Sequence, residues 1–210
     1  MSRYTGPVCR LCRREGEKLF LKGERCYTDK CAIGRRAKSM APGQHGAAMK
    51  KQKEYGTQLR EKQKAKRIYG LHETQFKNLF RRAEKKEGMA GVNLLILLEM
   101  RLDNIVYKMG MAESRNEARQ LVTHGHFTVN GRKANIPSMT LRLGDVIALS
   151  ERSRSLEKIK DLIANLDNRQ TVKWLEVDKN NIAAKIVSVP VRDDIDFPFR
   201  EHLIVELYSK

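Results

Sequence analysis

Residues 114–149 read SRNEARQLVTHGHFTVNGRKANIPSMTLRLGDVIAL, and they contain the signals for a capped helix followed by antiparallel strands. Ser114 and Glu117 have the spacing of a capping box, which starts a helix at the next residue, and Gly125 is suited to end it. An Asn-Gly turn after a short alternating strand is a strong hairpin signal. Residues 144–149 (GDVIAL) supply another strand. The segment therefore predicts a compact helix-and-hairpin unit.

Three helices are predicted before this unit. Residues 50–69 alternate charged side chains with sparse apolar ones, as expected of a helix on a surface. In residues 72–86 apolar side chains recur at intervals of three and four, with basic side chains on other faces. Residues 91–109 are apolar nearly all round, and we expect them to form the most buried helix, which Gly110 would end.

The last quarter of the chain shows weaker patterns. Residues 156–166 have helical spacing, and residues 174–177 indicate a strand. Residues 200–208 are apolar on one face, so we expect this terminal segment to dock onto an earlier helix.

The four cysteines of the chain all lie within its first 31 residues. Cys9 and Cys12 form a Cys-x2-Cys pair, and Cys26 and Cys31 form a Cys-x4-Cys pair after 13 intervening residues, a spacing that suits one tetrahedral zinc ion. Two disulfides, unmetallated thiols and an iron–sulfur cluster are the alternatives. Disulfides belong mainly to secreted chains, and the N-terminal residues lack the apolar run of a signal peptide. We predict a structural zinc ion, since four cysteines would close its coordination shell.

The net charge of +17 is concentrated towards the N-terminus, with +8 in residues 1–50, +6 in 51–100, +3 in 101–150 and zero in 151–210. This excess is larger than solubility requires and indicates a polyanionic partner. An anionic membrane surface is the alternative, but the basic stretches lack the bulky apolar face of an interfacial helix. No apolar run approaches the roughly 20 residues of a membrane helix. We therefore expect a soluble, cytosolic protein that binds nucleic acid.

Residues 34–46 follow the cysteines and end in Pro-Gly-Gln-His-Gly. Their content of Gly, Ala and basic residues predicts an extended arm that becomes ordered on RNA. His45 has no His, Cys or carboxylate neighbour in the sequence, so we expect it to stack on RNA or to be solvated.

Residues 101–154, with RLDN before the stretch quoted above and SERSR after it, resemble the small RNA-binding module named after small-subunit ribosomal protein four. The module also occurs in pseudouridine synthases, tyrosyl-tRNA synthetases and a heat-shock RNA binder, so the flanking residues are decisive. The two cysteine pairs, PGQHG, YGTQLREKQKAKRIYGLHETQF and the terminal HLIVELYS resemble bacterial members of the ribosomal protein four family, in its zinc-bearing branch. This resemblance covers essentially the whole chain.

The resemblance implies a structural constituent of the small ribosomal subunit that binds the 5′ domain of 16S ribosomal RNA early and nucleates assembly of the subunit body. It also implies a position near the messenger entrance beside ribosomal proteins three and five, with an influence on decoding accuracy. The acidic residues Asp193, Asp194 and Asp196 would meet a basic protein neighbour or form a solvated loop. No membrane and no small-molecule substrate are implied.

The predicted RNA-binding residues come from two sources. The basic N-terminal half contributes Arg10, Arg13, Arg14, Arg35, Arg36, Lys38, His45, Lys62, Lys66, Arg67, Arg81 and Arg82. The resemblance to the module implies Ser114, Arg115, Arg119, His124, His126, Asn130 and Lys133. For His124 and His126, capping of the helix is the structural alternative.

The expected fold is α+β and mainly helical. It begins with a zinc knuckle and a basic extended arm (1–45), followed by a helical RNA-binding domain (46–100) and an inserted α/β RNA-binding module (101–165). The C-terminal segment (166–210) is expected to dock onto the helical domain and complete it. An RNA-modifying enzyme is the main rival, but the sequence has no Gly-rich phosphate loop, nucleophile elbow or zinc-deaminase signature, and no catalytic residue is predicted. An RNA chaperone would explain the charge but not the flanking motifs.

Overall fold

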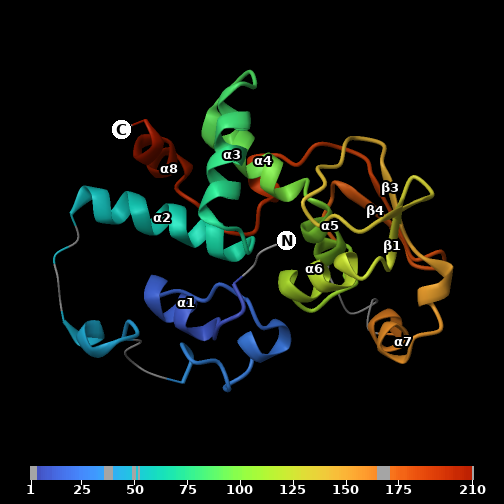
Figure 1. Cartoon of the computed structure of the whole chain (residues 1–210), viewed down its shortest axis with the longest axis horizontal. Coiled ribbons are helices and arrows are strands. Elements are labelled where there is room, and N and C mark those ends of the chain that lie inside the picture. Colours follow the sequence, from blue (N-terminus) through green and yellow to red (C-terminus); the bar gives the residue numbers. More distant parts are fainter. Residues whose placement is uncertain (1–3, 36–39, 49–50, 52, 165–170, 210) are drawn as a thin grey trace. The chain divides into compact units, whose positions relative to one another are not determined.

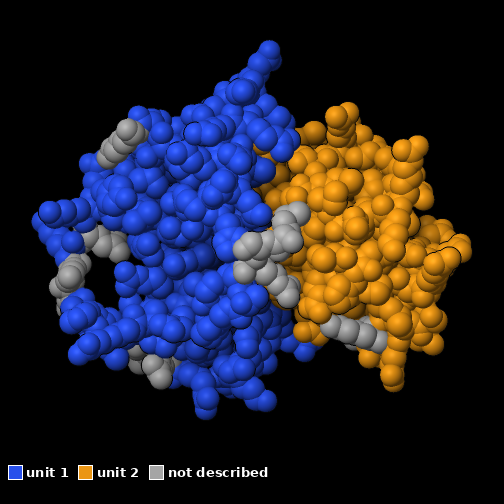
Figure 2. Space-filling model, viewed as in Figure 1, with its two compact units in different colours: residues 1–94, 198–210 blue, residues 95–197 orange. Residues whose placement is uncertain are grey.

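The computed structural model describes residues 4–35, 40–48, 51, 53–164 and 171–209 (Figure 1), and the chain forms two compact units. Unit 1 contains residues 1–94 and 198–210, and unit 2 contains residues 95–197 (Figure 2). The chain thus leaves unit 1 and returns to it after building unit 2. Helices together with a small antiparallel sheet agree with the α+β prediction.

Unit 1 is helical, and the helices predicted within residues 50–69 and 72–86 are confirmed. The first helix begins at Glu54, four residues after the start of its pattern, and the second begins at Glu73, one residue after the start of its pattern. In the described part of the predicted arm, a short 3₁₀ helix, η2, begins at Gln44. The elements of this unit are α1 (Cys9–Glu15), η1 (Gly23–Cys26), η2 (Gln44–Ala47), α2 (Glu54–Ile68), α3 (Glu73–Glu84), the first half of α4 (Ala90–Glu99) and α8 (Glu201–Tyr208).

Helix α8 packs against α2 and α3, which confirms the predicted docking of the terminal segment. The ring of Tyr208 stacks on Phe80 with centroids 4.6 Å apart. Gln58 of α2 is completely buried and donates a hydrogen bond of 3.0 Å to Glu206 of α8. The last turn of α8 therefore packs against α2 and α3 through both an apolar and a polar contact.

Helix α2 differs from the predicted surface helix. Its polar side chains Gln58, Glu61, Lys62 and Lys64 are buried. They tolerate burial because each contacts a polar partner, as in the 3.0 Å ion pair between Lys64 and Glu61. Charge alternation indicated a solvated helix, but α2 lies between other elements of unit 1, including α1 and α8.

Unit 2 begins in α4, and the expected single helix over residues 91–109 is broken. It forms α4 and α5 (Leu102–Lys108), separated by Met100 and Arg101. Arg101 is extended (φ −79°, ψ 140°) and forms a β-bridge with Thr140, so its backbone is withdrawn from the helix. Gly110 has φ 88° and follows the end of α5, as predicted.

The capped helix and the hairpin of unit 2 are confirmed. The Oγ atom of Ser114 accepts a hydrogen bond from the N–H of Glu117, at the start of α6 (Arg115–Thr123). Asn130 and Gly131 have φ of 49° and 77°, the left-handed pair that a two-residue hairpin turn requires. The hairpin joins β1 (Phe127–Val129) to β2 (Arg132–Ala134).

The sheet is antiparallel throughout, with strand order β2-β1-β3-β5-β4. One face packs onto α5 and α6 through side chains such as Phe127, Ile147 and Trp174. The remaining elements of unit 2 are β3 (Val146–Leu149), η3 (Glu151–Ser153), α7 (Glu157–Ala164), β4 (Leu175–Asp178), β5 (Ala183–Ile186) and η5 (Arg192–Asp194).

The predicted C-terminal segment, residues 166–210, is divided between the two units. Only residues 198–210 group with the helices of unit 1. Strands β4 and β5 instead extend the sheet, with Ile147 of β3 opposite Ala184 of β5. The reason is that β3 would otherwise present an unpaired edge, and the hairpin of β4 and β5 supplies its hydrogen bonds. None of the helices within the described residues combines the length and hydropathy needed to cross a bilayer.

Candidate nucleic-acid interface and cysteine cluster

Cys9 and Cys12 lie on α1, Cys26 ends η1 and Cys31 lies in the loop that follows, and all four thiols are free of disulfides. Burial raises the pKa of the Cys12 thiol, and electrostatic repulsion from Cys26, Cys9 and Cys31 adds to this rise. In the part of the chain that the structure describes, no three His, Cys, Asp or Glu side chains are arranged as a metal-binding group. The predicted zinc knuckle therefore stays a prediction.

Backbone N–H groups point at the sulfur atoms. The N–H of Lys22 donates to Sγ of Cys26 at 3.4 Å. Burial opposes ionisation of Cys31, but N–H groups of Gly34 and Ile33, helped by nearby cationic side chains, outweigh it and lower the pKa of that thiol. Such N–H donors stabilise thiolates.

Helix α1 is attached to α2 by a carboxylate between two arginines. Glu15 lies 3.2 Å from Arg60 and also pairs with Arg67, and its side chain is only 2% exposed. Burial raises the pKa of Glu15 despite both guanidinium groups, and burial likewise lowers the pKa of Arg67. Arg67, a predicted RNA contact, thus has an intramolecular partner.

Glu73 joins three helices of unit 1. Its carboxylate at the start of α3 accepts hydrogen bonds from Lys62 (2.7 Å) and Lys66 (2.8 Å) of α2, and from the hydroxyl of Tyr208 (3.0 Å) of α8. Burial opposes ionisation, but the two lysines outweigh it and lower the pKa of Glu73 to about 2. Lys62 and Lys66, both predicted RNA contacts, are therefore held by this carboxylate.

The other predicted RNA contacts differ in exposure, and most of those described are exposed. Arg13 is half-buried and donates from Nε to the carbonyl of Met40 at 3.1 Å, while Arg36 and Lys38 lie outside the described residues. The exposed members of the predicted set are Arg10, Arg14, Arg35, His45, Arg81, Arg82, His124, Asn130 and Lys133.

Several predicted residues of the module act inside the protein. Arg119 is 4% exposed and lies 3.6 Å from the carboxylate of Asp103, which Arg101 also binds at 3.0 and 2.6 Å. Ser114 serves as the helix cap, and the carboxylate of Glu117 accepts from the N–H of Glu113. The structure thus assigns Arg119 and Ser114 structural contacts, and their RNA contacts stay predictions.

The histidines and the hairpin turn lie close together in sequence but differ in surroundings. His126 is half-buried, with Nδ1 at 2.9 Å from Oγ of Ser153, and burial, with smaller contributions from His124 and Lys133, lowers its pKa. Asn130 holds the turn, since its Oδ1 accepts from the N–H of Val146 at 2.9 Å.

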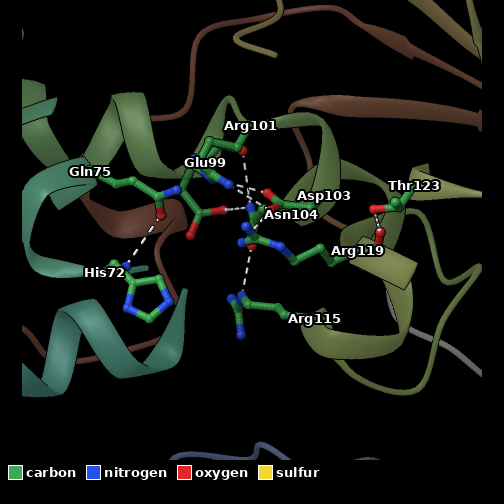
Figure 3. A network of polar contacts seen from close by, with 9 residues as sticks. All are labelled: His72, Gln75, Glu99, Arg101, Asp103, Asn104, Arg115, Arg119 and Thr123. Atoms are coloured by element: carbon green, nitrogen blue, oxygen red, sulfur yellow. Dashed lines mark hydrogen bonds and ion pairs between the residues drawn. The ribbon is translucent and has the colours of Figure 1, made fainter. Parts of the chain in front are cut away.

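Arg115 belongs to a polar network that sequence reasoning missed (Figure 3). Its Nε donates to Oδ1 of Asn104 at 2.7 Å, and its guanidinium lies over the ring of Tyr107, 4.6 Å from the centroid. Asn104 in turn donates to the carbonyl and to the carboxylate of Glu99. The only signal in the sequence was the polar RLDN stretch inside an apolar run.

Two family descriptions match adjacent parts of the chain. "Ribosomal protein S4/S9 N-terminal domain" matches residues 3–99, and "S4 domain" matches residues 100–147. The chain is 62% identical to small ribosomal subunit protein uS4 of Clostridioides difficile, 60% identical to that of Caldicellulosiruptor bescii and 59% identical to that of Pelotomaculum thermopropionicum. Each match covers 210 residues and 100% of both chains.

Proposed function

Because the chain belongs to the family of small ribosomal subunit protein uS4, we infer that it is a structural constituent of the cytoplasmic small ribosomal subunit and binds 16S ribosomal RNA. The strongest support is the 62% identity to uS4 of Clostridioides difficile, which extends over the full length of both chains and includes both matched domains. The family consists of structural proteins, so the chain is not an enzyme.

We further propose that the RNA target is the 5′ domain and that binding nucleates assembly of the subunit body. The charge distribution supports a polyanion-facing N-terminal half, with +14 in residues 1–100 and +3 in residues 101–210. Exposed arginines on α1 and α3 provide phosphate contacts at several separate points. Multivalent binding of this kind would hold several RNA helices in one arrangement.

We also propose ribosomal proteins three and five as neighbours near the messenger entrance, with a role in decoding accuracy. Only the resemblance supports this placement. Of the acidic residues expected to meet a basic protein, Asp196 pairs with Lys108, and Asp194 accepts from the N–H of Val191. Asp193 is exposed and is the best candidate for an intermolecular contact.

The test of RNA binding compares an isolated 5′-domain transcript of 16S ribosomal RNA with an unrelated structured RNA of equal length, across a salt series. We expect a preference of about a hundredfold or more that persists as salt is added. Equal affinities that fall together with salt would refute the proposed target and favour a general RNA chaperone.

A pair of matched variants tests the phosphate contacts. R81Q/R82Q removes two exposed charges from α3, and K173Q/K185Q removes two exposed charges from unit 2, where the chain carries no net charge after residue 150. The first variant should lower the slope of log affinity against log salt by about 1.5, and the second should leave it unchanged. Equal slopes in both variants would contradict phosphate binding by α3.

We propose that Cys9, Cys12, Cys26 and Cys31 hold one structural zinc ion. The chemistry of the donor set fits, because all four thiols are free of disulfides and backbone N–H groups point at the sulfurs of Cys26 and Cys31. When bound, the ion would neutralise the mutual repulsion of the thiolates and cross-link α1 to the loop that contains Cys31.

Metal analysis of the purified chain tests this proposal. We expect one zinc per chain, lost in Cys12→Ser but retained in Lys30→Ser, a control that changes an exposed residue beside Cys31. Chelation should make residues 4–35 sensitive to protease while α2 remains protected. A chain that contains no zinc, or an N-terminal segment that keeps its resistance after chelation, would refute a structural ion.

A further inference from the structure

We propose that the ring of Tyr27 is a stacking site for an unpaired base of the bound RNA, and that the ring of Phe20 supports it on one side. The inference rests on the proposed RNA binding and deepens it, because it assigns a contact to a base where the cationic side chains contact phosphate. It concerns residues 18–35 of unit 1, all of which the structure describes.

Tyr27 is a large aromatic residue on the surface of unit 1. It is 72% exposed, although the residue before it, Cys26, is only 8% exposed. At this exposure a large part of the ring faces solvent, whatever other contacts the side chain makes. A tyrosine ring in this position suits a partner that is itself flat and partly apolar, as a nucleobase is.

Phe20 and Tyr27 form one aromatic surface, the aromatic pair. Their ring centroids are 5.1 Å apart and their planes are inclined at 31°, within the range of favourable ring contacts. Leu19 and Leu21, on either side of Phe20, are 1% and 8% exposed, whereas Phe20 is half-buried. The chain therefore buries the two leucines and keeps the phenylalanine against Tyr27.

The backbone of Phe20 is left-handed, with φ 50°. This conformation is unfavourable for a residue with a side chain, so it persists only where the surrounding structure enforces it. Here the anchors are the buried neighbours Leu19 and Leu21. Such angles are found preferentially at binding sites, which supports a functional role for the aromatic pair.

The loop that carries Tyr27 is held by hydrogen bonds. The N–H of Tyr27 donates to the carbonyl of Glu24 at 2.9 Å. Nε of Arg25 donates to the carbonyl of Lys30 at 3.4 Å, which connects the two ends of the loop. A ring on a loop of this kind loses less conformational freedom on binding than a ring on a free segment would.

The surrounding charge favours a nucleic acid as the partner. Residues 18–35 contain five Lys and Arg residues against two Asp and Glu residues, and Lys22, Arg25 and Lys30 are exposed. Proteins that bind single-stranded RNA combine cations for the backbone with aromatic rings for the bases. The base must be unpaired, because bases within an RNA helix are already stacked on their neighbours. Its identity is not specified, since every base has a π-face.

The alternative is that Tyr27 is solvated and only covers the cysteine loop. The change Tyr27→Leu separates the two possibilities. Leucine keeps an apolar side chain beside Phe20 but offers no flat π-face, so stacking predicts that it loses as much RNA affinity as alanine. Tyr27→Phe and Tyr27→Trp keep a ring, and stacking predicts that they retain the affinity.

The experiment measures the affinity of the full chain for the 5′-domain transcript across a salt series. Tyr27→Ala and Tyr27→Leu should each lower the affinity about tenfold and leave the slope of log affinity against log salt unchanged, because neither removes a charge. Tyr27→Phe and Tyr27→Trp should stay within about twofold of the wild type. Lys22→Gln is the matched control, since it removes a nearby exposed charge and should lower the slope by about 0.7.

The supporting role of Phe20 is tested by coupling. Phe20→Leu should lower the affinity about threefold in the wild-type background, and it should cause no further loss in a Tyr27→Ala background. A loss that is the same in both backgrounds would mean that Phe20 acts independently of Tyr27 and would refute its supporting role.

Ultraviolet cross-linking of the complex gives a direct readout on the unaltered chain, because a stacked base lies in contact with the ring. After digestion of RNA and protein, mass spectrometry should find a nucleotide attached to Tyr27. This measurement decides the matter if Tyr27→Ala loses the protease resistance of residues 4–35 and its affinity cannot be interpreted.

Three outcomes would overturn the proposal. These are wild-type affinity in Tyr27→Ala, wild-type affinity in Tyr27→Leu, and the absence of a nucleotide on Tyr27 after cross-linking. Equal wild-type affinity for the 5′-domain transcript and the unrelated RNA would refute the proposed target alone. Because stacking tolerates any base, the loss in Tyr27→Ala could then be measured on either RNA.

Discussion

The carboxylate of Glu73 joins α2, α3 and α8, so its charge can be tested by the change Glu73→Gln. Glutamine keeps an acceptor oxygen for the hydroxyl of Tyr208 but removes the ion pairs with Lys62 and Lys66. The variant therefore isolates the electrostatic part of this junction.

The expected loss can be worked out in two ways. Lowering the pKa of Glu73 from 4.5 to about 2 corresponds to about 3.4 kcal/mol before solvent screening. Because the Glu73 side chain is 46% exposed, screening reduces this figure by about half. Alternatively, two partly exposed ion pairs at about 0.5 kcal/mol each, and a negative charge in the first turn of α3 at about 0.5 kcal/mol, also sum to about 1.5 kcal/mol.

Thermal and denaturant unfolding at pH 7 provide the assay. A loss of about 1.5 kcal/mol should lower the melting temperature by about 3–6 °C in a chain of this size. The matched control is Glu84→Gln, which removes the same charge from an exposed position at the other end of α3 and should change stability by less than about 0.5 kcal/mol. Equal effects of the two changes would mean that net charge, and not this junction, is responsible.

The pH dependence gives an independent check. The pKa of Glu73 is lowered on folding, so its contribution is complete above about 4.5, the ordinary value, and is lost as the pH falls towards about 2. The difference between wild type and Glu73→Gln should therefore be constant from pH 7 to 5.5 and fall to about half by pH 3. A difference that stays constant down to pH 3 would refute the assignment of the stability to this carboxylate.

Three further changes test local parts of the fold by the same unfolding measurements. Glu15→Gln leaves Arg60 and Arg67 without their buried carboxylate and should cost about 2 kcal/mol, and limited proteolysis should show α1 released from α2; unchanged protection of α1 would contradict this. Ser114→Ala removes the cap of α6 and should cost about 1 kcal/mol, while a loss below about 0.3 kcal/mol would show that the cap is dispensable. Gly131→Ala places a side chain at φ 77° and should cost about 1 kcal/mol; no loss would mean that the turn relaxes to another type.

The elements that the sequence predicted well depend on neighbours within a few residues. The cap at Ser114, the left-handed pair at Asn130 and Gly131, and the stop at Gly110 were all recognisable because each reflects a short-range hydrogen bond or a backbone angle. The periodic pattern of α3 succeeded for the same reason, since it needs only one apolar side to be buried.

The break at Arg101 could not be read from periodicity. Apolar residues continue on both sides of it, and only the pairing of Arg101 with Thr140, 39 residues later, withdraws the backbone from the helix. The attachment of β4 and β5 to β3 was missed for a similar reason, because hydrogen-bonding potential at a strand edge has no sequence signature.

Candidate RNA contacts show the same limit. The residue type identified the cations, but their charge alone did not reveal which of them have partners inside the protein. Lys62 meets Glu73 from another helix, Arg67 meets Glu15 across 52 residues, and Arg119 is buried against Asp103. In each case the partner is a carboxylate that the fold brings near. Only the folded structure therefore shows which cationic side chains are paired inside the protein and which are exposed to solvent.

The sequence by itself determined the excess of cations in the N-terminal half, the two cysteine pairs, the capped helix and hairpin, and the family, because composition, spacing and local backbone preferences are properties of adjacent residues. Only the tertiary structure decided that α2 buries its polar side chains, that the module gains two strands, and that Arg67 pairs with Glu15. These features arise where distant segments meet, and there burial makes an unpaired charge or strand edge costly enough to dictate its partner.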